Sequence, residues 1–461
     1  MPGWLWFLLQ FLVIGGLFAY IIISSKKAMA EGKTTWFMKT WKKDSVKSVA
    51  SSLISIVCGL LIGSVILFIM ALIPTKGISL SFKSFIDGIQ LIFSGIFNTG
   101  RTDGGGLKFG FNASLFGDML FRATPLILTG LSVALAFKTG LFNIGAPGQY
   151  LVSTATTLIL ALSIPTTIVP PFFVWIIAFL GGIIVAAIWG SVPGIFKAFL
   201  NVNEVITCIM MNWIAANVVT MAFDKEIGLF KHLLDPSGTK NWAYVFKTTH
   251  NNVATSKFGL DLIFPNSQVN GGIIIAIIIA ILIYIILNKT TFGYKLKACG
   301  SNKSASKYAG INEKICTIAS MAIAGGLAGA GAGLYFLAGN TEFAWETYQS
   351  LPAVGFNGIP VALLACNNPL GVIFSASFIS LLDVNGMQLK YMTPYNEYIT
   401  SIITAVIVYF SAFSLLFKQL LEGKIKINPR NIISKDGGNT VETIDDSNNI
   451  KEETIAEEED K

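Results

Sequence analysis

The sequence predicts an all-α integral membrane protein that crosses the lipid bilayer many times. The composition, the mean hydropathy and the number of long apolar runs carry this prediction. Charged residues make up 13% of the 461 residues, hydrophobic residues make up 53%, and the mean hydropathy is +0.65. Soluble globular proteins use about 25% charged residues because their surface faces water. The low charge density therefore excludes an ordinary soluble enzyme and indicates a surface that faces lipid.

Apolar runs of roughly 20 residues, the length that a spanning helix needs, occur along most of the chain. Uninterrupted candidates lie at 3–24, 48–73, 118–137, 172–192, 204–223, 271–288, 315–338 and 397–417. The regions 140–164 and 352–383 are also apolar but are interrupted by Gly, Pro and Asn, so each fits one span, a broken helix or a tight pair. The sequence predicts roughly nine to eleven transmembrane helices, with broken-helix segments near the pathway.

The distribution of lysines predicts which loops face the cytoplasm. Seven lysines in 25–47 and six in 289–314 outnumber the three acids of these two loops, and basic loops stay on the cytoplasmic side. If 140–164 forms one span and 352–383 forms two, eleven spans place the N-terminus outside and the C-terminus inside. The segment 3–24 has no basic region before it, so we interpret it as an anchor helix rather than a cleaved signal peptide.

Composition divides the chain into three parts. An anchor helix with a basic cytoplasmic loop occupies 1–47, a transmembrane domain occupies 48–417, and a charged tail occupies 418–461. The tail has seven basic residues, eleven acidic residues and no aromatic residue, so it buries too little apolar surface to fold alone. We predict a short amphipathic exit followed by a disordered cytoplasmic segment.

The chain offers little material for catalysis or metal binding. Its five cysteines include no Cys-x-x-Cys pair, and His232 and His250 lie 18 residues apart, a spacing that fits no zinc site. The Gly-Lys-Thr triplet at 32–34 lacks the earlier glycine of a phosphate-binding loop. We expect no catalytic residue and no metal site, and transport driven by ATP would require a separate ATPase subunit.

Two interruptions carry amide side chains into apolar segments, where unsatisfied polar atoms are costly. The segment 138–149 contains Asn143 and Gln149 together with three glycines and one proline. It fits either a short cytoplasmic turn or a broken helix that lines a translocation path, and its residues alone do not separate the two. The segment 354–361 repeats the order Phe-Asn, glycine, proline and contains Asn357.

Small and polar residues also mark two of the uninterrupted spans. Asn212 lies two turns inside the span 204–223, where an amide must pair across helices or face a pore. Gly325, Gly329 and Gly333 recur every four residues within another span. Because lipid supplies no hydrophobic drive for association, such spacing favours close contact between helix backbones. We interpret these glycines as a helix-packing face rather than a dinucleotide-binding loop.

Taken together, these segments resemble the permeases of ABC importers for nucleosides, within the wider simple-sugar and branched-chain-amino-acid permease group. The resemblance extends from about residue 50 to 417 and rests on four stretches in the family's order, namely 136–149, 202–212, 291–311 and 355–371. Pro147 departs from the acidic residue that the family often has there. From these segments we select candidates for the substrate pathway: Asn143, Gln149, Asn212 and Asn357.

The resemblance also implies a set of partners. It implies a permease of the plasma (inner) membrane that binds no cofactor itself, with ATP used by an ABC ATPase subunit. A second permease, an extracytoplasmic substrate-binding lipoprotein and membrane lipid complete the expected partners, and no nucleic acid is expected. The cytoplasmic loop 289–315 is expected to dock into the ATPase, through Gly300, Tyr308, Ala309 and Gly310.

An ion-coupled secondary transporter of a small polar solute is the alternative hypothesis. It requires membrane-embedded acids that bind a cation or a proton, and Asp383 is the main candidate. The scarcity of acidic companions for Asp383 favours the ABC permease.

Overall fold

The computed structural model describes residues 44–72, 82–101, 107–224, 226–233, 243–244, 251–344, 346, 348–393, 395 and 398–421. Within these residues helices dominate, and seven of them are long and apolar enough to cross a membrane. The predicted all-α polytopic fold is confirmed. The predicted anchor 3–24, most of the loop 25–47 and the tail beyond residue 421 lie outside the described residues.

The long helices follow the predicted apolar runs. They are α3 (Asp44–Leu72), α5 (Ala113–Lys138), α7 (Pro171–Leu200), α8 (Glu204–Ala222), α11 (Gly272–Lys289), α14 (Glu313–Phe336) and α16 (Pro369–Met392). The other helices of the bundle are α6 (Ala146–Ser163), which is as long as α11, and the shorter apolar helices α15 (Ala353–Leu364) and α17 (Tyr398–Ala412). The interrupted region 140–164 thus supplies one helix, and the region 352–383 supplies the pair α15 and α16.

Short elements connect these helices. They are α4 (Phe82–Ser94), η1 (Gly95–Phe97), β1 (Asn98–Arg101), β2 (Leu107–Phe109), η2 (Lys231–Leu233), β3 (Ala243–Tyr244), η3 (Asn251–Val253), α10 (Leu260–Ile263), α12 (Thr291–Ser301), α13 (Lys303–Tyr308), β4 (Phe343–Ala344) and α18 (Ser414–Leu421). The strand β1 pairs antiparallel with β2, and β3 pairs antiparallel with β4.

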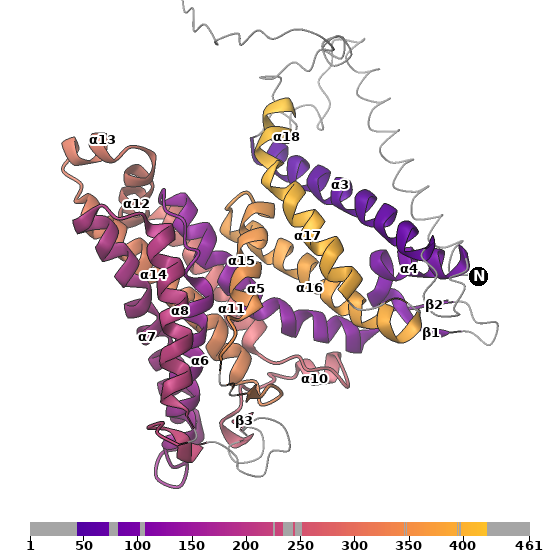
Figure 1. The fold of residues 1–461 in the computed structure, drawn as a ribbon, viewed down its shortest axis with the longest axis horizontal. Helices are drawn as coiled ribbons and strands as arrows, with labels where there is room; N and C mark the ends of the chain where they lie inside the picture. Colours follow the sequence, from indigo (N-terminus) through magenta and orange to yellow (C-terminus); the bar gives the residue numbers. More distant parts are fainter. Residues whose placement is uncertain are drawn as a thin grey trace, which may run out of the picture.

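Successive spanning helices run in opposite directions, so the lysine-rich loop 289–314 lies at the same end of the molecule as α18. Gly59 of α3 faces Ile407 of α17, and Gly63 faces Ile403, which makes these two helices antiparallel. Figure 1 shows α12, α13 and α18 together at the upper end, with α10 and β3 at the lower end. We call the upper end the lysine-rich end and the lower end the opposite end.

The helices α5 and α14 form the centre of the bundle. In their apolar windows 83% and 72% of the residues are buried, against 28% in α7 and in α8. The central helix α14 packs against α7, α5 and α6, while α7, α8 and α11 expose large apolar side chains such as Ile184, Trp213 and Leu282. Exposed apolar surface of this extent suits contact with lipid or with another subunit.

The glycines of α14 lie where this helix meets α7. A Cβ atom added to Gly325 would lie 3.0 Å from the Cα atom of Gly190, and one added to Gly329 would lie 2.5 Å from the Cβ atom of Ala186. A Cβ atom on Gly333 would lie 2.9 Å from the ring of Phe179. These glycines therefore allow the two backbones to approach more closely than any side chain would permit.

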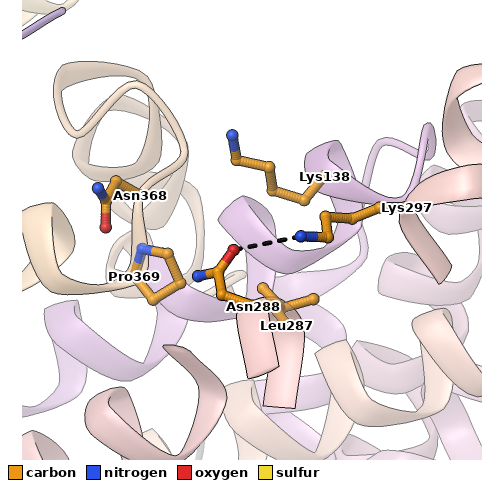
Figure 2. A pocket seen from close by; sticks show the side chains of 6 residues that line it. All are labelled: Lys138, Leu287, Asn288, Lys297, Asn368 and Pro369. Atoms are coloured by element: carbon orange, nitrogen blue, oxygen red, sulfur yellow. Dashed lines mark hydrogen bonds between the residues drawn. The ribbon is translucent and has the colours of Figure 1, made fainter. Parts of the chain in front are cut away.

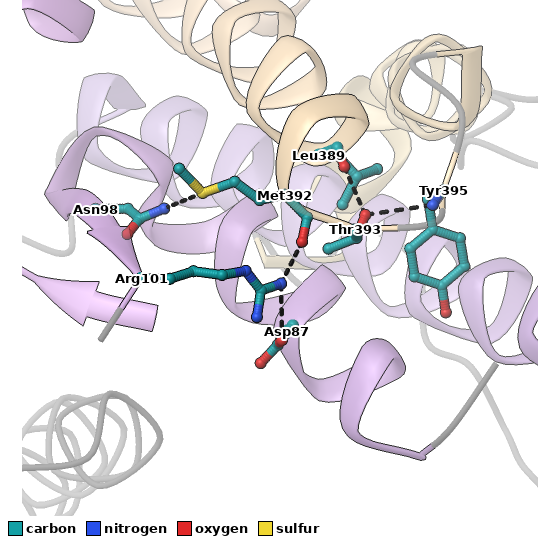
Figure 3. A network of polar contacts seen from close by, with 7 residues as sticks. All are labelled: Asp87, Asn98, Arg101, Leu389, Met392, Thr393 and Tyr395. Carbon is teal, nitrogen blue, oxygen red and sulfur yellow. Dashed lines mark hydrogen bonds and ion pairs between the residues drawn. The ribbon is translucent and has the colours of Figure 1, made fainter. Parts of the chain in front are cut away.

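A polar network joins the connecting elements α4 and β1 to α16 (Figure 3). Arg101 of β1 pairs with Asp87 of α4 at 3.3 Å and also donates a hydrogen bond to the carbonyl oxygen of Met392. The hydroxyl of Tyr395 donates to the carbonyl oxygen of Leu67 at 3.5 Å, and burial raises the pKa of Tyr395. These contacts fix the β1–β2 hairpin and α4 against the helices that follow α15.

Candidate functional site

After α5 the chain turns back into the bundle before α6 begins. Asn143 Nδ2 donates a hydrogen bond to Ser132 Oγ at 2.9 Å. Ser132 lies six residues before Lys138, the last residue of α5, which corresponds to a depth of about 9 Å at about 1.5 Å of rise per residue. Irregular backbone is tolerated at membrane depth where protein buries it. We call the segment 139–145 the re-entrant turn. It is a short turn, as the first predicted alternative requires, and it enters the bundle as irregular backbone, as the broken-helix alternative requires.

Two of the predicted pathway amides pair with each other beside this turn. Asn143 Nδ2 donates to Gln149 Oε1 at 2.8 Å, and Gln149 Nε2 donates to Asn143 Oδ1 at 3.1 Å. Asn143 Oδ1 also accepts the backbone N–H of Gly145 at 3.0 Å. Both side chains are fully buried. The pair closes the re-entrant turn onto the first turn of α6.

A third predicted amide, Asn212, reaches the same place from α8. Its Oδ1 accepts the backbone N–H of Gly148 at 2.9 Å, and its Nδ2 donates to the carbonyl oxygen of Ile144 at 3.0 Å. The first N–H groups of a helix have no partner within the helix, so Asn212 satisfies a group that α6 itself leaves open. We call Asn143, Gln149 and Asn212 the amide network.

The fourth predicted pathway residue, Asn357, lies on α15 and does not join the amide network. It is half-buried and forms no hydrogen bond with the residues that the structure describes. Its helix touches the start of α6, because a Cβ atom on Gly355 would lie 2.6 Å from the nitrogen of Pro147. The structure therefore brings three of the four amides together, and the role of all four in a pathway stays a prediction.

The predicted docking residues divide into an exposed set and a packed one. Tyr308 at the end of α13 is 94% exposed, and Ala309 and Gly310 beside it are also exposed. Gly300 of α12 is half-buried instead, and a Cβ atom added there would lie 2.7 Å from the backbone nitrogen of Gly140. The backbone of α12 thus touches the first residues of the re-entrant turn.

A small pocket of about 150 Å³ lies near this contact (Figure 2). Its lining includes the ammonium groups of Lys138 and Lys297, and no acidic residue lines it. Lys297 Nζ donates to Asn288 Oδ1 at 3.2 Å, and the N-terminus of α16, capped by Asn368, adds the positive end of a helix dipole. Two cations without an acidic neighbour suit an acidic group of another subunit.

The acid that the ion-coupled alternative requires lies elsewhere. Asp383 is half-buried on α16, and the positive charge of Arg122 on α5 acts on it. In the described part of the chain, no three His, Cys, Asp or Glu side chains gather as ligands of a cation. A lone half-buried acid without further ligands beside it in the described residues gives the ion-coupled hypothesis no specific support.

The sequence did not reveal which hydroxyl and backbone groups form hydrogen bonds with the amides. Ser132 lies in a run of small and apolar residues, and the backbone groups of Ile144 and Gly148 carry no signal in the sequence. Only the folded chain shows that Asn212, which lies 64 residues after Gly148, bonds to it. The position of Asn212 two turns inside an apolar helix predicted that its amide has a hydrogen-bond partner, but it did not identify that partner.

Comparisons with known proteins agree with one another. The family model for the branched-chain amino acid transport system permease component matches residues 115–412. The nucleoside ABC transporter permease protein NupB of Lactococcus lactis is 33% identical over 82% of this chain and 94% of its own length. The guanosine ABC transporter permease protein NupP of Bacillus subtilis is 32% identical over 81% of this chain and 95% of its own length.

A relative with another substrate in its name is more distant. The glucose ABC transporter permease protein TsgB13 of Haloferax volcanii is 27% identical over 66% of this chain and 78% of its own length. No solved structure matches the chain. The family match runs from the first turn of α5 to the end of α17 and includes the amide network and the docking residues. The chain therefore belongs to the family of permease components of branched-chain amino acid transport systems.

Proposed function

We propose that this chain forms the translocation pathway of an ATP-driven importer for nucleosides. The observation that carries the proposal is the similarity to NupB and NupP, which extends over more than nine-tenths of each of those proteins. The match to the glucose permease is lower in both identity and coverage. A nucleoside is therefore favoured over a simple sugar as the transported solute.

The proposal assigns ATP hydrolysis to a partner ATPase that docks at the lysine-rich end. The exposed ring of Tyr308 and the ammonium groups of Lys138 and Lys297, in a pocket that no described acidic residue lines, provide a contact surface for that subunit. In this mechanism α12 moves with the ATPase, and its contact at Gly300 displaces Thr139 and Gly140. The ATPase shifts the permease between two conformations because its contacts with the permease differ between them.

The amide network is proposed to open as the re-entrant turn moves. Asn143 and Gln149 now satisfy each other, and Asn212 bonds to the backbone of Gly148 and Ile144, so in this conformation the network closes the pathway. When the turn and α8 separate, the same amide groups, together with Asn357, are free to contact water or the solute. A second permease and an extracytoplasmic substrate-binding lipoprotein complete the proposed assembly, with 1–47, 48–417 and 418–461 as proposed domains.

Uptake by the complete assembly in proteoliposomes tests the proposed function. With ATP and the ATPase subunit present, we expect accumulation of labelled guanosine in preference to glucose and leucine. Omission of either ATP or the ATPase is the control and is expected to stop uptake. Uptake that continues on an ion gradient alone would establish the ion-coupled alternative instead.

Removal of the Tyr308 side chain is expected to uncouple the ATPase without unfolding the permease. Tyrosines at the centre of interfaces contribute about 2 kcal/mol or more, which corresponds to roughly a 30-fold loss of affinity on truncation. Because Tyr308 is 94% exposed, Tyr308→Ala should melt like the wild type while retaining far less ATPase during purification. Tyr391→Ala, at an exposed tyrosine of α16, is the matched control. Equal ATPase retention by both variants contradicts the docking assignment.

The protein crosses the membrane several times, and we further propose that the lysine-rich end and the C-terminus face the cytoplasm, with the N-terminus outside. Leu262→Cys in α10, at a side chain that is 86% exposed, is expected to react with a membrane-impermeant maleimide in intact cells. Lys303→Cys should react only after the membrane is permeabilised. The wild-type chain, with its five free cysteines, sets the background. The reverse pattern of labelling inverts the proposed orientation.

A further inference from the structure

An aromatic cavity lies directly beside the amide network, on the side facing the opposite end. It has a volume of about 250 Å³, slightly below the ~300 Å³ at which pockets for drug-sized ligands begin. The first turns of α6, the end of α14, β4 and the segment that leads into α15 form its walls. This size suits a planar ring system better than a large flexible solute.

The walls of the aromatic cavity present ring faces and edges. Phe336 makes edge-to-face contacts with Tyr335 at 5.2 Å, with Phe343 at 6.0 Å and with Tyr150 at 6.4 Å between ring centroids. Because these neighbours meet Phe336 at steep angles rather than stacked on it, its ring faces are not covered by parallel partners. An aromatic side chain in this arrangement can stack against the π-face of a base, and such stacking is sequence-tolerant.

Two polar atoms in this wall have no partner within the described part of the chain. Tyr150 is only 2% exposed, and its buried hydroxyl has no hydrogen-bond partner among these residues. Gln349 Oε1 is also buried and has no partner among them. A hydroxyl offers a donor and an amide oxygen offers an acceptor. Buried polar groups in folded proteins normally have partners, so a ligand that reached these two atoms would satisfy them by supplying an acceptor and a donor.

The described lining of the aromatic cavity carries no charge. None of the twelve described residues that line it is acidic or basic. Burial of a charged group without a counter-charge is costly, so an amino acid, with its ammonium and carboxylate groups, fits poorly. A neutral solute with an aromatic ring and hydrogen-bonding edges fits well.

The position of the cavity connects it to the proposed pathway. Tyr150 directly follows Gln149 of the amide network, and Val354 of the lining directly precedes Gly355, which packs on Pro147. Residues of the amide network and of the contact between α15 and α6 therefore adjoin the lining along the chain. A solute held here would enter the bundle when these contacts open.

We propose that the aromatic cavity binds the base of a nucleoside, with Phe336 stacking on the base and with Tyr150 and Gln349 bonding to its edge. This inference rests on the proposed function and deepens it. The same site selects for neutral aromatic solutes and against amino acids. The sugar of the nucleoside extends toward the mouth of the cavity near Ser350.

The variant Tyr150→Phe tests this assignment with little risk to folding. It removes a hydroxyl that has no partner among the described residues, so the folded permease should be at least as stable as the wild type. Loss of one hydrogen bond to the solute is expected to lower the rate of guanosine uptake by roughly tenfold at saturating substrate-binding protein. Tyr391→Phe, outside the cavity, is the matched control, and melting temperature and ATPase activity are measured for both.

The outcomes distinguish a failure of the cavity assignment from a failure of the proposed function. If the wild-type assembly does not accumulate guanosine with ATP, the proposed function fails and this inference fails with it. If the wild type transports guanosine and Tyr150→Phe transports it equally fast, only the assignment of the cavity is overturned.

A protection experiment identifies which part of the solute the cavity holds. Val354→Cys places a thiol in the lining, and the wild-type chain sets the background of labelling. Guanosine or guanine at ten times its dissociation constant should slow modification of this thiol about tenfold by occupancy, whereas ribose and leucine should not. Protection by ribose without protection by guanine overturns the assignment of the base, and protection by leucine overturns the selection for neutral solutes.

Discussion

Asn212→Leu is expected to abolish uptake and to destabilise the folded permease. The amide of Asn212 is buried and bonds to the N–H of Gly148 and to the carbonyl oxygen of Ile144. Leucine has a similar size but pairs with neither group, so one buried and one partly buried backbone group lose their partner, at up to about 1–3 kcal/mol each. The sum of about 2–6 kcal/mol is a large part of the ~5–15 kcal/mol that stabilises a typical folded domain.

The measurement compares Asn212→Leu with Asn217→Leu on the same helix. Asn217 is exposed, and its amide donates to the carbonyl oxygen of Trp213 within α8 at 2.8 Å. We expect a clear fall in the melting temperature of the purified protein for Asn212→Leu and almost none for Asn217→Leu. An Asn212→Leu protein that melts and transports like the wild type would show that the amide network does not hold the start of α6.

The second large loss of stability and of uptake is expected from Gly325→Ala in α14. The added Cβ atom would overlap the carbonyl oxygen of Ala186 and lie 3.0 Å from the Cα atom of Gly190. Both contacts are with the backbone of α7, which yields only if the whole helix moves. We expect a destabilisation near the upper end of the ~1–3 kcal/mol that overpacking usually costs, and loss of uptake because α14 is central to the bundle.

Gly326→Ala provides a control at the next residue of the same helix. A Cβ atom on Gly326 would lie 3.4 Å from Cγ2 of Ile183, which is an ordinary contact with a side chain. Both substitutions gain the same helix propensity, so the difference between their melting temperatures reports the contact with α7 alone. Equal melting temperatures would mean that α7 and α14 are not held at the distance seen here.

The fold could be predicted where the membrane dictates it. A spanning helix needs a long apolar run to shield its backbone from lipid, so α3, α7 and α11 are readily recognised in the sequence. The amphipathic helix α4 and the β1–β2 hairpin were not predicted, because they lie in a connection where only one face packs on the bundle. The 12-residue helix α15 is about 18 Å long at about 1.5 Å per residue, too short to span by itself.

The candidate site could be predicted only in part. The cost of polar groups in an apolar setting identified Asn143, Gln149 and Asn212, and the lysine-rich loop identified the segment that carries Tyr308. The same argument did not find Tyr150, which lines a cavity and has a buried hydroxyl without a partner among the described residues. Aromatic residues are common in membrane proteins, so a tyrosine in an apolar helix carries no signal until its neighbours are known.

The sequence by itself determined that this protein lies in a membrane, which segments cross it and which ends of the helices carry the lysines. These properties depend on composition and on local runs, because lipid imposes the same requirement on each span independently. The tertiary structure alone decided that α6 begins inside the bundle, that Asn212 satisfies its first turn, and that Tyr150 lines a cavity. Each of these features depends on contacts between segments far apart in the chain, and the packing of small residues such as Gly325 brings those segments together.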